Sequence, residues 1–494
     1  MRVTARNMTL WCLAAALSSV SGFAASNGRD ITLIDVVKNQ NANAAAALIK
    51  QHVDVHAAEG DGSTALHWAA HWDDVATADL LIRAGANVNA ATDLGVTPLS
   101  LACTNRSAAM VDKLLAAGAN ANAVTMTGES LLMSAARTGN LDVVKALLAH
   151  GANVNAQEVS RGQTALMWAV AEQHADIVRL LIEHKADVSA RTHVTDLLVN
   201  EGDADRGRNT KPVLEMIKKG GSTPLLFAAR VGDLASARLL IAAGANPNDV
   251  APDGNSVLVL AAHSGQRAVA EFLLDKDANP NAAGGGYTAL HAAVLRGDVD
   301  LVKALLAHGA DPNARLAKGT PMFRNGNDYS FNESLTAATP FFLAAKYAEA
   351  GIMRALASAG ADTASPIRDG TTPLMAAAGL GWNNAENRRG QPVADGTAFR
   401  DEASALAAVK LAVELGADVN AVNQVGNAAI HAAVPKGFHT VIQYLVDHGA
   451  KLDIANGRGQ TPLRLAQDER TAGVFGRDSL KSTEELLRQL GAKE

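Results

Sequence analysis

The sequence predicts an all-α solenoid of about 11–12 helix-turn-helix repeats joined by hairpin loops. The first observation behind this is a glycine that recurs at a nearly constant spacing. Successive glycines lie 33, 33 and 34 residues apart in one run, 33 and 32 in the next, and the series later resumes. The positions are Gly62, Gly95, Gly128, Gly162, Gly221, Gly254, Gly286, Gly370, Gly426 and Gly459. The second observation is that two short apolar stripes with helical spacing follow these glycines.

The stretch 286–314 shows the unit most clearly. Thr288 is a residue type that caps helix N-termini, and the apolar residues after it recur at i, i+3 and i+4. Gly297 is expected to end this helix, and Gly309 to end a second one in the left-handed conformation. A unit of about 33 residues cannot bury both of its stripes alone, so it needs a neighbour on each side.

The repeated phrases carry a family resemblance. The first helix reads TALHWAA at 64–70, TPLSLAC at 97–103, TPLLFAA at 223–229 and TPLMAAA at 372–378. The unit closes with GANVNA at 85–90 and 151–156, and with GADVNA at 416–421. This pattern, many copies in register over about residues 31–494, resembles the ankyrin repeat family. The resemblance implies a stack of L-shaped units that presents an extended concave groove to protein partners.

The N-terminal residues differ from the rest. Residues 1–25 combine a basic start, a short apolar run and a stretch of small residues, which is typical of a secretory signal peptide. The apolar run is too short to span a membrane. We therefore expect an exported protein of bacterial type, located in the periplasm or outside the cell, that is not an integral membrane protein.

The period divides the remaining chain. We expect a degenerate N-terminal capping repeat at 26–59, repeats at 60–190, 221–314 and 339–458, and a C-terminal capping repeat at 459–494. Within this last repeat, Ser482 and Glu485 have capping-box spacing and predict a second helix from Ser482 to Leu490.

Three insertions break the period, at 191–220, at 315–338 and near 382–404. For the first, the segments VTDLLVN and PVLEMIKKG favour a short helix with a mobile loop. In an ankyrin-like array the three insertions would lie on the rims of the concave groove. Long loops that interrupt a regular array are usually functional or disordered.

The sequence offers no recognisable catalytic chemistry. It contains no HExxH, no CxxC and no phosphate-binding GxxxxGK[ST]. His67, His291 and His431 occupy the fourth position of the TPLH phrase, where the resemblance implies a hydrogen bond to the neighbouring loop. Cys103 replaces an alanine of the motif and is expected to be a small buried residue. We expect no enzyme activity, no cofactor and no bound metal.

Candidate partner-binding residues come from aligning the copies. Two variable positions follow the small residues of each first helix, and the resemblance places them in the groove. Among them, only Glu172 is acidic, although the net charge of the chain is −6. The candidates are His71, Trp72, Arg137, Arg230, Arg296, Lys346 and Tyr347. Trp72 and Tyr347 are expected to be exposed aromatic anchors, whereas Trp68, Trp168 and Phe227 are expected to belong to the core.

These observations favour an exported, non-enzymatic scaffold whose concave groove, hairpin tips and rim insertions bind a protein with an acidic surface. A small-molecule or polysaccharide binder, and an enzyme or enzyme subunit with a site built from the insertions, remain alternatives. Nucleic acid is not an expected ligand, because the protein is acidic and exported.

The signal peptide gives the first testable prediction. Cleavage after the small-residue stretch should leave a mature N-terminus near residue 25 in the native host. Mass spectrometry of the purified protein would show this. An abundant form that retains Met1 or Arg2 would contradict export.

Overall fold

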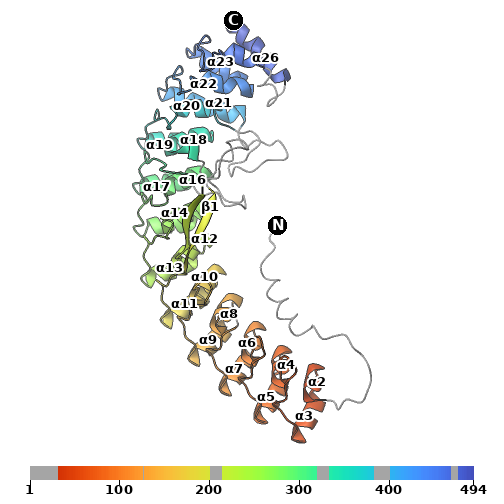
Figure 1. The fold of residues 1–494 in the computed structure, drawn as a ribbon. Helices are drawn as coiled ribbons and strands as arrows, with labels where there is room; N and C mark the ends of the chain where they lie inside the picture. The colour runs from red at the N-terminus through yellow and green to blue at the C-terminus, as the bar shows by residue number, and fades with distance from the viewer. Residues whose placement is uncertain are drawn as a thin grey trace.

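The fold is seen in a computed structural model that describes residues 32–125, 127–200, 214–319, 333–382, 401–468 and 477–493. Helix pairs stack along one curved array, with the N-terminal and C-terminal repeats at opposite ends (Figure 1). This confirms the predicted α-helical solenoid, and the described residues hold twelve helix pairs.

The first helix of each pair contacts the first helices of its neighbours. Along the stretch from α2 to α18 these helices line the inner side of the arc (Figure 1). They are α2 (Leu33–Lys38), α4 (Ala65–His71), α6 (Pro98–Thr104), α8 (Leu131–Thr138), α10 (Ala165–Ala171), α12 (Pro224–Val231), α14 (Val257–Ser264), α16 (Ala289–Arg296), α18 (Pro340–Lys346), α20 (Pro373–Ala377), α22 (Ala429–Ala433) and α24 (Pro462–Gln467).

The second helices form a parallel outer row. They are α3 (Ala42–Lys50), α5 (Val75–Arg83), α7 (Ala108–Ala116), α9 (Leu141–Ala149), α11 (Ala175–Glu183), α13 (Leu234–Ala242), α15 (Arg267–Leu274), α17 (Val299–Ala307), α19 (Ala350–Ser358), α21 (Glu402–Glu414), α23 (His439–Asp447) and α26 (Arg477–Gln489). Two short 3₁₀ helices, η1 (Glu333–Leu335) and η2 (Val434–Lys436), complete the helical elements described.

The pair α16 and α17 shows why these residues form this unit. The Thr288 side chain accepts a hydrogen bond from the His291 amide, which satisfies a donor at the first turn. Gly297 ends α16 with a φ of 71°, in the left-handed region that glycine adopts without a Cβ clash. The predicted boundaries of this unit are confirmed.

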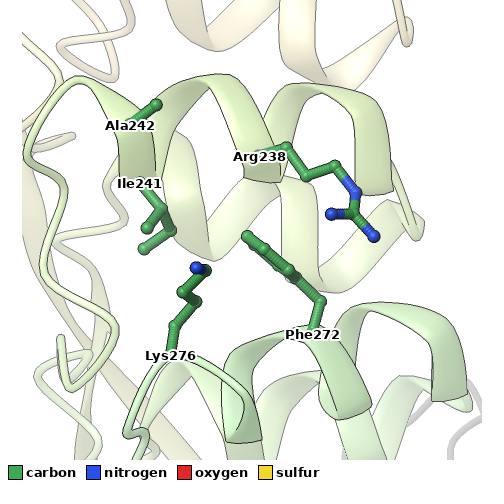
Figure 2. A pocket seen from close by; sticks show the side chains of 5 residues that line it. All are labelled: Arg238, Ile241, Ala242, Phe272 and Lys276. Carbon is green, nitrogen blue, oxygen red and sulfur yellow. The ribbon is translucent and has the colours of Figure 1, made fainter.

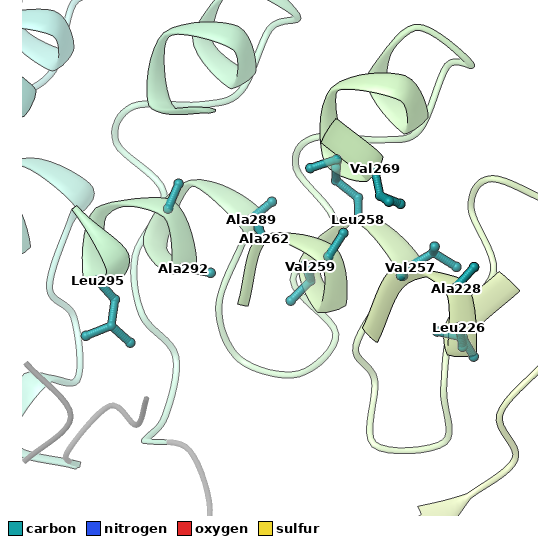
Figure 3. Packing of buried hydrophobic residues seen from close by; sticks show 14 of the residues in the cluster. Leu226, Ala228, Val257, Leu258, Val259, Ala262, Val269, Ala289, Ala292 and Leu295 are labelled. Carbon is teal, nitrogen blue, oxygen red and sulfur yellow. The ribbon is translucent and has the colours of Figure 1, made fainter. Parts of the chain in front are cut away.

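The core is a thin apolar layer shared between neighbouring repeats. Between α12, α14 and α16 it consists of small and branched side chains such as Leu226, Val257 and Ala289 (Figure 3). Cys103 belongs to this layer, and burial raises the pKa of its thiol to about 12. The expectation of an inert buried cysteine is therefore confirmed.

Histidines of the TPLH phrase join one repeat to the next. In His291, Nδ1 accepts a hydrogen bond from the Thr288 amide at 3.2 Å, and Nε2 lies 3.3 Å from the carbonyl oxygen of Ala338. His67 and His431 make the equivalent contacts with the carbonyl oxygens of Val96 and Gln460. The implied hydrogen bond to the neighbouring loop is confirmed in all three copies.

Asparagines of the closing phrase form a second link between repeats. The Asn122 side chain donates to the Gly151 carbonyl at 2.9 Å and accepts from the Asn153 amide at 2.7 Å. The same pair of bonds recurs at Asn89, Asn155, Asn248, Asn281, Asn313 and Asn420. We call these seven residues the asparagine ladder.

The ladder has two internal breaks. Ser189 occupies the asparagine position before the insertion at 191–220, and its hydroxyl bonds within its own loop to Asp187. Ala364 occupies the position before the repeat that carries the insertion near 382–404. The first insertion therefore follows one missing asparagine directly, and the third lies within the repeat after the other.

The first insertion contains an antiparallel ribbon of β1 (Val194–Asn200) and β2 (Leu214–Gly220). The expectation of a short helix here is wrong, because two short apolar segments satisfy each other's backbone groups by pairing in register from Val194 with Gly220 to Asn200 with Leu214. The cores of the other two insertions, 320–332 and 383–400, lie outside the described residues.

The C-terminal repeat also departs from one expectation. Its second helix, α26, begins at Arg477 and not at Ser482, so Ser482 lies inside the helix and does not cap it. The repeat closes the array through Leu487, which is fully buried.

Burial of the TPLH histidines predicts an acid-sensitive fold. Burial lowers the pKa of His291 from 6.5 to about 4, so the unfolded chain binds a proton that the folded chain resists. The contribution of neutral His291 to the free energy of unfolding is therefore fully present above about pH 6.5, and it is lost progressively as the pH falls towards 4. This pKa difference corresponds to roughly 3 kcal/mol.

Urea unfolding of His291→Gln between pH 7 and pH 5 tests this prediction. The variant should be less stable at pH 7, yet lose less stability on acidification than the wild type. His150→Gln, which changes an exposed histidine at the end of α9, is the control. An unchanged pH dependence in His291→Gln would contradict the assignment.

Candidate functional site

The predicted partner-binding residues lie at the C-terminal ends of the inner helices. His71, Arg137, Arg230, Arg296 and Lys346 close α4, α8, α12, α16 and α18. Trp72 and Tyr347 are the capping residues just beyond α4 and α18. Because the inner helices stack in register, these positions follow the array as a row and do not meet at one point.

Two of these side chains bond to a backbone carbonyl group in a neighbouring repeat. Arg296 Nε donates to the carbonyl oxygen of His263 at 2.6 Å, and Lys346 Nζ donates to that of Gly381 at 2.9 Å. Lys436 reaches the carbonyl of Trp382 in the same manner, at 2.7 Å. His263 lies in the last turn of α14, where carbonyl groups lack intrahelical partners and a cation is favourable, whereas Gly381 and Trp382 lie beyond the end of α20. Alignment of the repeats did not reveal that these side chains bond to backbone carbonyl groups of a neighbouring repeat.

Arg137 and Arg230 differ in how far their charge is neutralised. Arg137 lies 3.1 Å from Glu129 and 5.4 Å from the ring centroid of Trp168, so its charge is paired. Arg230 is exposed and lies 5.8 Å from the ring centroid of Phe227. Among the described residues no acidic side chain forms an ion pair with Arg230, so its positive charge is not neutralised by a salt bridge. The carbonyl groups that Arg296 and Lys346 contact are neutral.

Tyr347 does not serve as an exposed aromatic residue. Its side chain is only 7% exposed and belongs to the apolar core, so this expectation is wrong. The position in the motif determines where the backbone lies, but whether an aromatic side chain there is buried depends on its packing against the neighbouring repeat. Trp72, at the equivalent position, is 43% exposed as expected.

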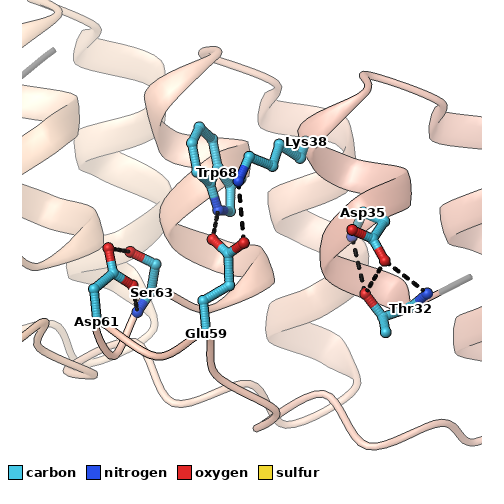
Figure 4. Close-up of polar contacts among 7 residues, drawn as sticks. All are labelled: Thr32, Asp35, Lys38, Glu59, Asp61, Ser63 and Trp68. Atoms are coloured by element: carbon cyan, nitrogen blue, oxygen red, sulfur yellow. Dashed lines mark hydrogen bonds and ion pairs between the residues drawn. The ribbon is translucent and has the colours of Figure 1, made fainter. Parts of the chain in front are cut away.

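Trp72 is part of an aromatic cluster at the N-terminal end of the row. Its ring stacks on Trp68 at a centroid distance of 6.5 Å and meets His71 edge-on at 4.6 Å. Trp68 is buried, and its indole Nε1 donates to Glu59, which also pairs with Lys38 at 3.0 Å (Figure 4). Trp68 is thus a core residue as expected, and it supports the more exposed Trp72.

Trp168 and Phe227 were also assigned to the core. Both side chains are half-buried and pack against the apolar layer. They therefore contribute to the core from its edge, beneath Arg137 and Arg230.

A shallow pocket of about 410 Å³ lies between the outer helices α13 and α15. Arg238 and Lys276 flank the ring of Phe272, with Ile241 and Ala242 beside them (Figure 2). The cations lie 4.7 and 6.0 Å from the ring centroid, so this site is a packed cation–π arrangement. It supplies no nucleophile or acid–base pair.

The ranges that the structure describes hold neither a cluster of metal-binding side chains nor a helix that could span a membrane. In these ranges, His, Cys, Asp and Glu side chains nowhere gather as a group of three that could hold a metal ion. None of the helices described is both long and apolar enough to cross a bilayer.

Stacked helix pairs with a ladder of closing asparagines define an α-solenoid of helix-turn-helix repeats. A family model for ankyrin repeats in three copies matches residues 33–125, 107–192, 225–315 and 400–475, which together exceed half of the chain. The chain belongs to the ankyrin repeat family. Such repeats generally mediate interactions between proteins, and they are typically found in non-enzymatic scaffolds.

Two individual proteins are similar to part of the chain. The neurogenic locus notch homolog protein 1 of Xenopus tropicalis is 34% identical over 143 residues, which is 26% of this chain and 6% of that protein. The chain thus spans only a small part of this relative. Among solved structures, the human ASB11 ankyrin repeat domain shows 29% identity and a TM-score of 0.39, covering 49% of this chain and 96% of that domain.

Proposed function

We propose that this chain is an exported, non-enzymatic scaffold that binds the acidic surface of a protein partner along the ends of its inner helices. The observation that carries the proposal is the row formed by Arg230, Arg296 and Lys346 on a net acidic protein. We call these three residues the basic row. Repeat arrays suit this role because they present long, rigid surfaces.

The contacts of the row favour pre-organised binding. The hydrogen bonds of Arg296 and Lys346 to neighbouring carbonyl oxygens hold the two cations in fixed places. Side chains that are already ordered lose less conformational entropy when a partner binds. Arg230 lies over Phe227 and extends the row towards the N-terminal repeats.

The aromatic cluster would add apolar contact at one end of the row. Trp72 is exposed but supported by Trp68 and His71, and such aromatic side chains are frequent anchors in protein interfaces. Tyr347 contributes nothing directly, because it is buried. The partner would therefore contact Trp72 through an apolar residue and the basic row through Asp or Glu side chains.

Charge reversal at Arg230 tests the proposal. A partner captured from a cell-envelope extract and then purified should associate several-fold more slowly with Arg230→Glu at low salt, because opposite charges accelerate encounter. The difference should shrink at high salt, where the charges are screened.

The matched control is Arg354→Glu, which makes the same charge change at an exposed position of the outer helix α19. It should leave association nearly unchanged, and neither variant should alter stability by more than about 0.5 kcal/mol. Equal association rates for Arg230→Glu and the wild type at low salt would show that the row is not a binding surface.

A further inference from the structure

The ribbon of β1 and β2 is fixed firmly at its root. The Arg191 guanidinium donates to the carbonyl oxygen of Gly221 at 2.8 Å and forms an ion pair with Asp249. The Thr192 amide donates to Ser222 at 3.1 Å, and its hydroxyl accepts from the Ser222 amide at 2.9 Å. These bonds attach the start of β1 to the repeat that follows the insertion.

Beyond its root, the ribbon has two unpaired edges. It consists of two strands only, as far as the described residues show. Among the described residues, the backbone groups of 195–199 and 215–219 make no hydrogen bonds to backbone groups outside the ribbon. Such edges present rows of unpaired N–H and C=O groups to another extended chain. A two-stranded ribbon is only marginally stable in water, so a third strand would stabilise it.

The two edges differ in how they are protected. β2 carries Lys218 and Lys219, both exposed, and lysine on an edge strand discourages further pairing. Over 194–198, β1 carries a single charge, Asp196, which lies 3.4 Å from Lys218. The other residues of this stretch are Val, Thr and Leu, and all are exposed. The outer edge of β1 is thus the less protected of the two.

Apolar side chains beside this edge would contact an added strand. On one face, Leu198 lies opposite Met216, and these side chains are 54% and 57% exposed. Val194 lies on the same face, because residues two apart on a strand point to the same side. A third strand would cover part of this surface and place one residue beside Asp196.

We propose that the outer edge of β1 at 194–198 binds an extended segment of a protein partner as a third strand. The segment would have β-branched or apolar residues beside Val194 and Leu198, and a basic residue beside Asp196. The backbone would supply affinity and the alternating side chains would supply specificity. This surface is distinct from the basic row and adds a second mode of recognition.

A peptide of alternating valine and threonine with one central lysine is a suitable probe. Its binding can be followed by fluorescence anisotropy, and its location by hydrogen exchange in fragments covering 194–198 and 216–219. The wild type should bind the peptide and show slower exchange in the β1 fragment. A peptide with glutamate in place of the lysine should bind more weakly.

Two lysine substitutions separate the edge from the face. Leu198→Lys protects the β1 edge and should weaken binding by about tenfold, equivalent to about 1.4 kcal/mol. Met216→Lys places the same charge directly opposite, on β2, and should weaken binding much less. Exchange of both free variants should match that of the free wild type, which shows that the ribbon is retained.

Three results would overturn the proposal. If the peptide slowed hydrogen exchange only in β2, or in neither strand, the β1 edge would be excluded as its binding site. Equal weakening by both substitutions would indicate binding to the apolar face. A dimer in light scattering that Leu198→Lys dissociates would identify a second copy of the chain as the occupant. Arg230→Glu should leave peptide binding unchanged. The peptide experiment therefore tests the β1 edge independently of the proposal that the basic row binds a partner.

Discussion

In seven of the twelve repeats, one asparagine side chain makes two hydrogen bonds to the backbone of the next repeat, and the regular stacking depends on this contact. The asparagine amide both donates and accepts, as Asn281 does with Gly309 and Asp311. A bond of this kind contributes about 0.5–1.5 kcal/mol. The bonds act together with the thin alanine-rich core, which alone would permit neighbouring repeats to slide.

At the two breaks in the asparagine ladder, other contacts join neighbouring repeats. At Ser189 the missing rung is replaced by the ion pair of Arg191 and Asp249 and by the bonds between Thr192 and Ser222. At Ala364 the loop is instead joined to the next repeat by Asn423, whose side chain donates to Thr371 Oγ1 at 3.1 Å, and by Gln424, whose side chain donates to the carbonyl oxygen of Arg368 at 3.0 Å. These substitutes are side-chain contacts outside the repeated pattern, so coupling between repeats is expected to be weaker there.

Much of the fold followed from the sequence because each repeat contains its own local signals. The Thr or Ser cap, the glycine after a helix and the buried histidine are local signals within one copy, and each recurs in several of the twelve repeats. The ribbon was missed because VTDLLVN and LEMIKKG are short segments of mixed apolar and charged residues, whose pattern does not distinguish a strand from a helix. Only their mutual pairing decides the outcome.

The candidate site was harder to predict for a related reason. The motif correctly placed Arg230 and Trp72 at exposed ends of inner helices. It could not show that Tyr347 turns inward, or that Arg296 and Lys346 bond to carbonyl oxygens of neighbouring repeats. Those outcomes depend on contacts between repeats, which no single copy of the motif contains.

Native-state hydrogen exchange in increasing urea tests the role of the asparagine ladder most directly. The amides of α9 and α11, which Asn155 links, should share one opening free energy, whereas a step should separate α11 from α13 across Ser189, and α19 from α21 across Ala364. Opening free energies that vary smoothly along the array, with no step at Ser189 or Ala364, would contradict the claim that the ladder couples the repeats.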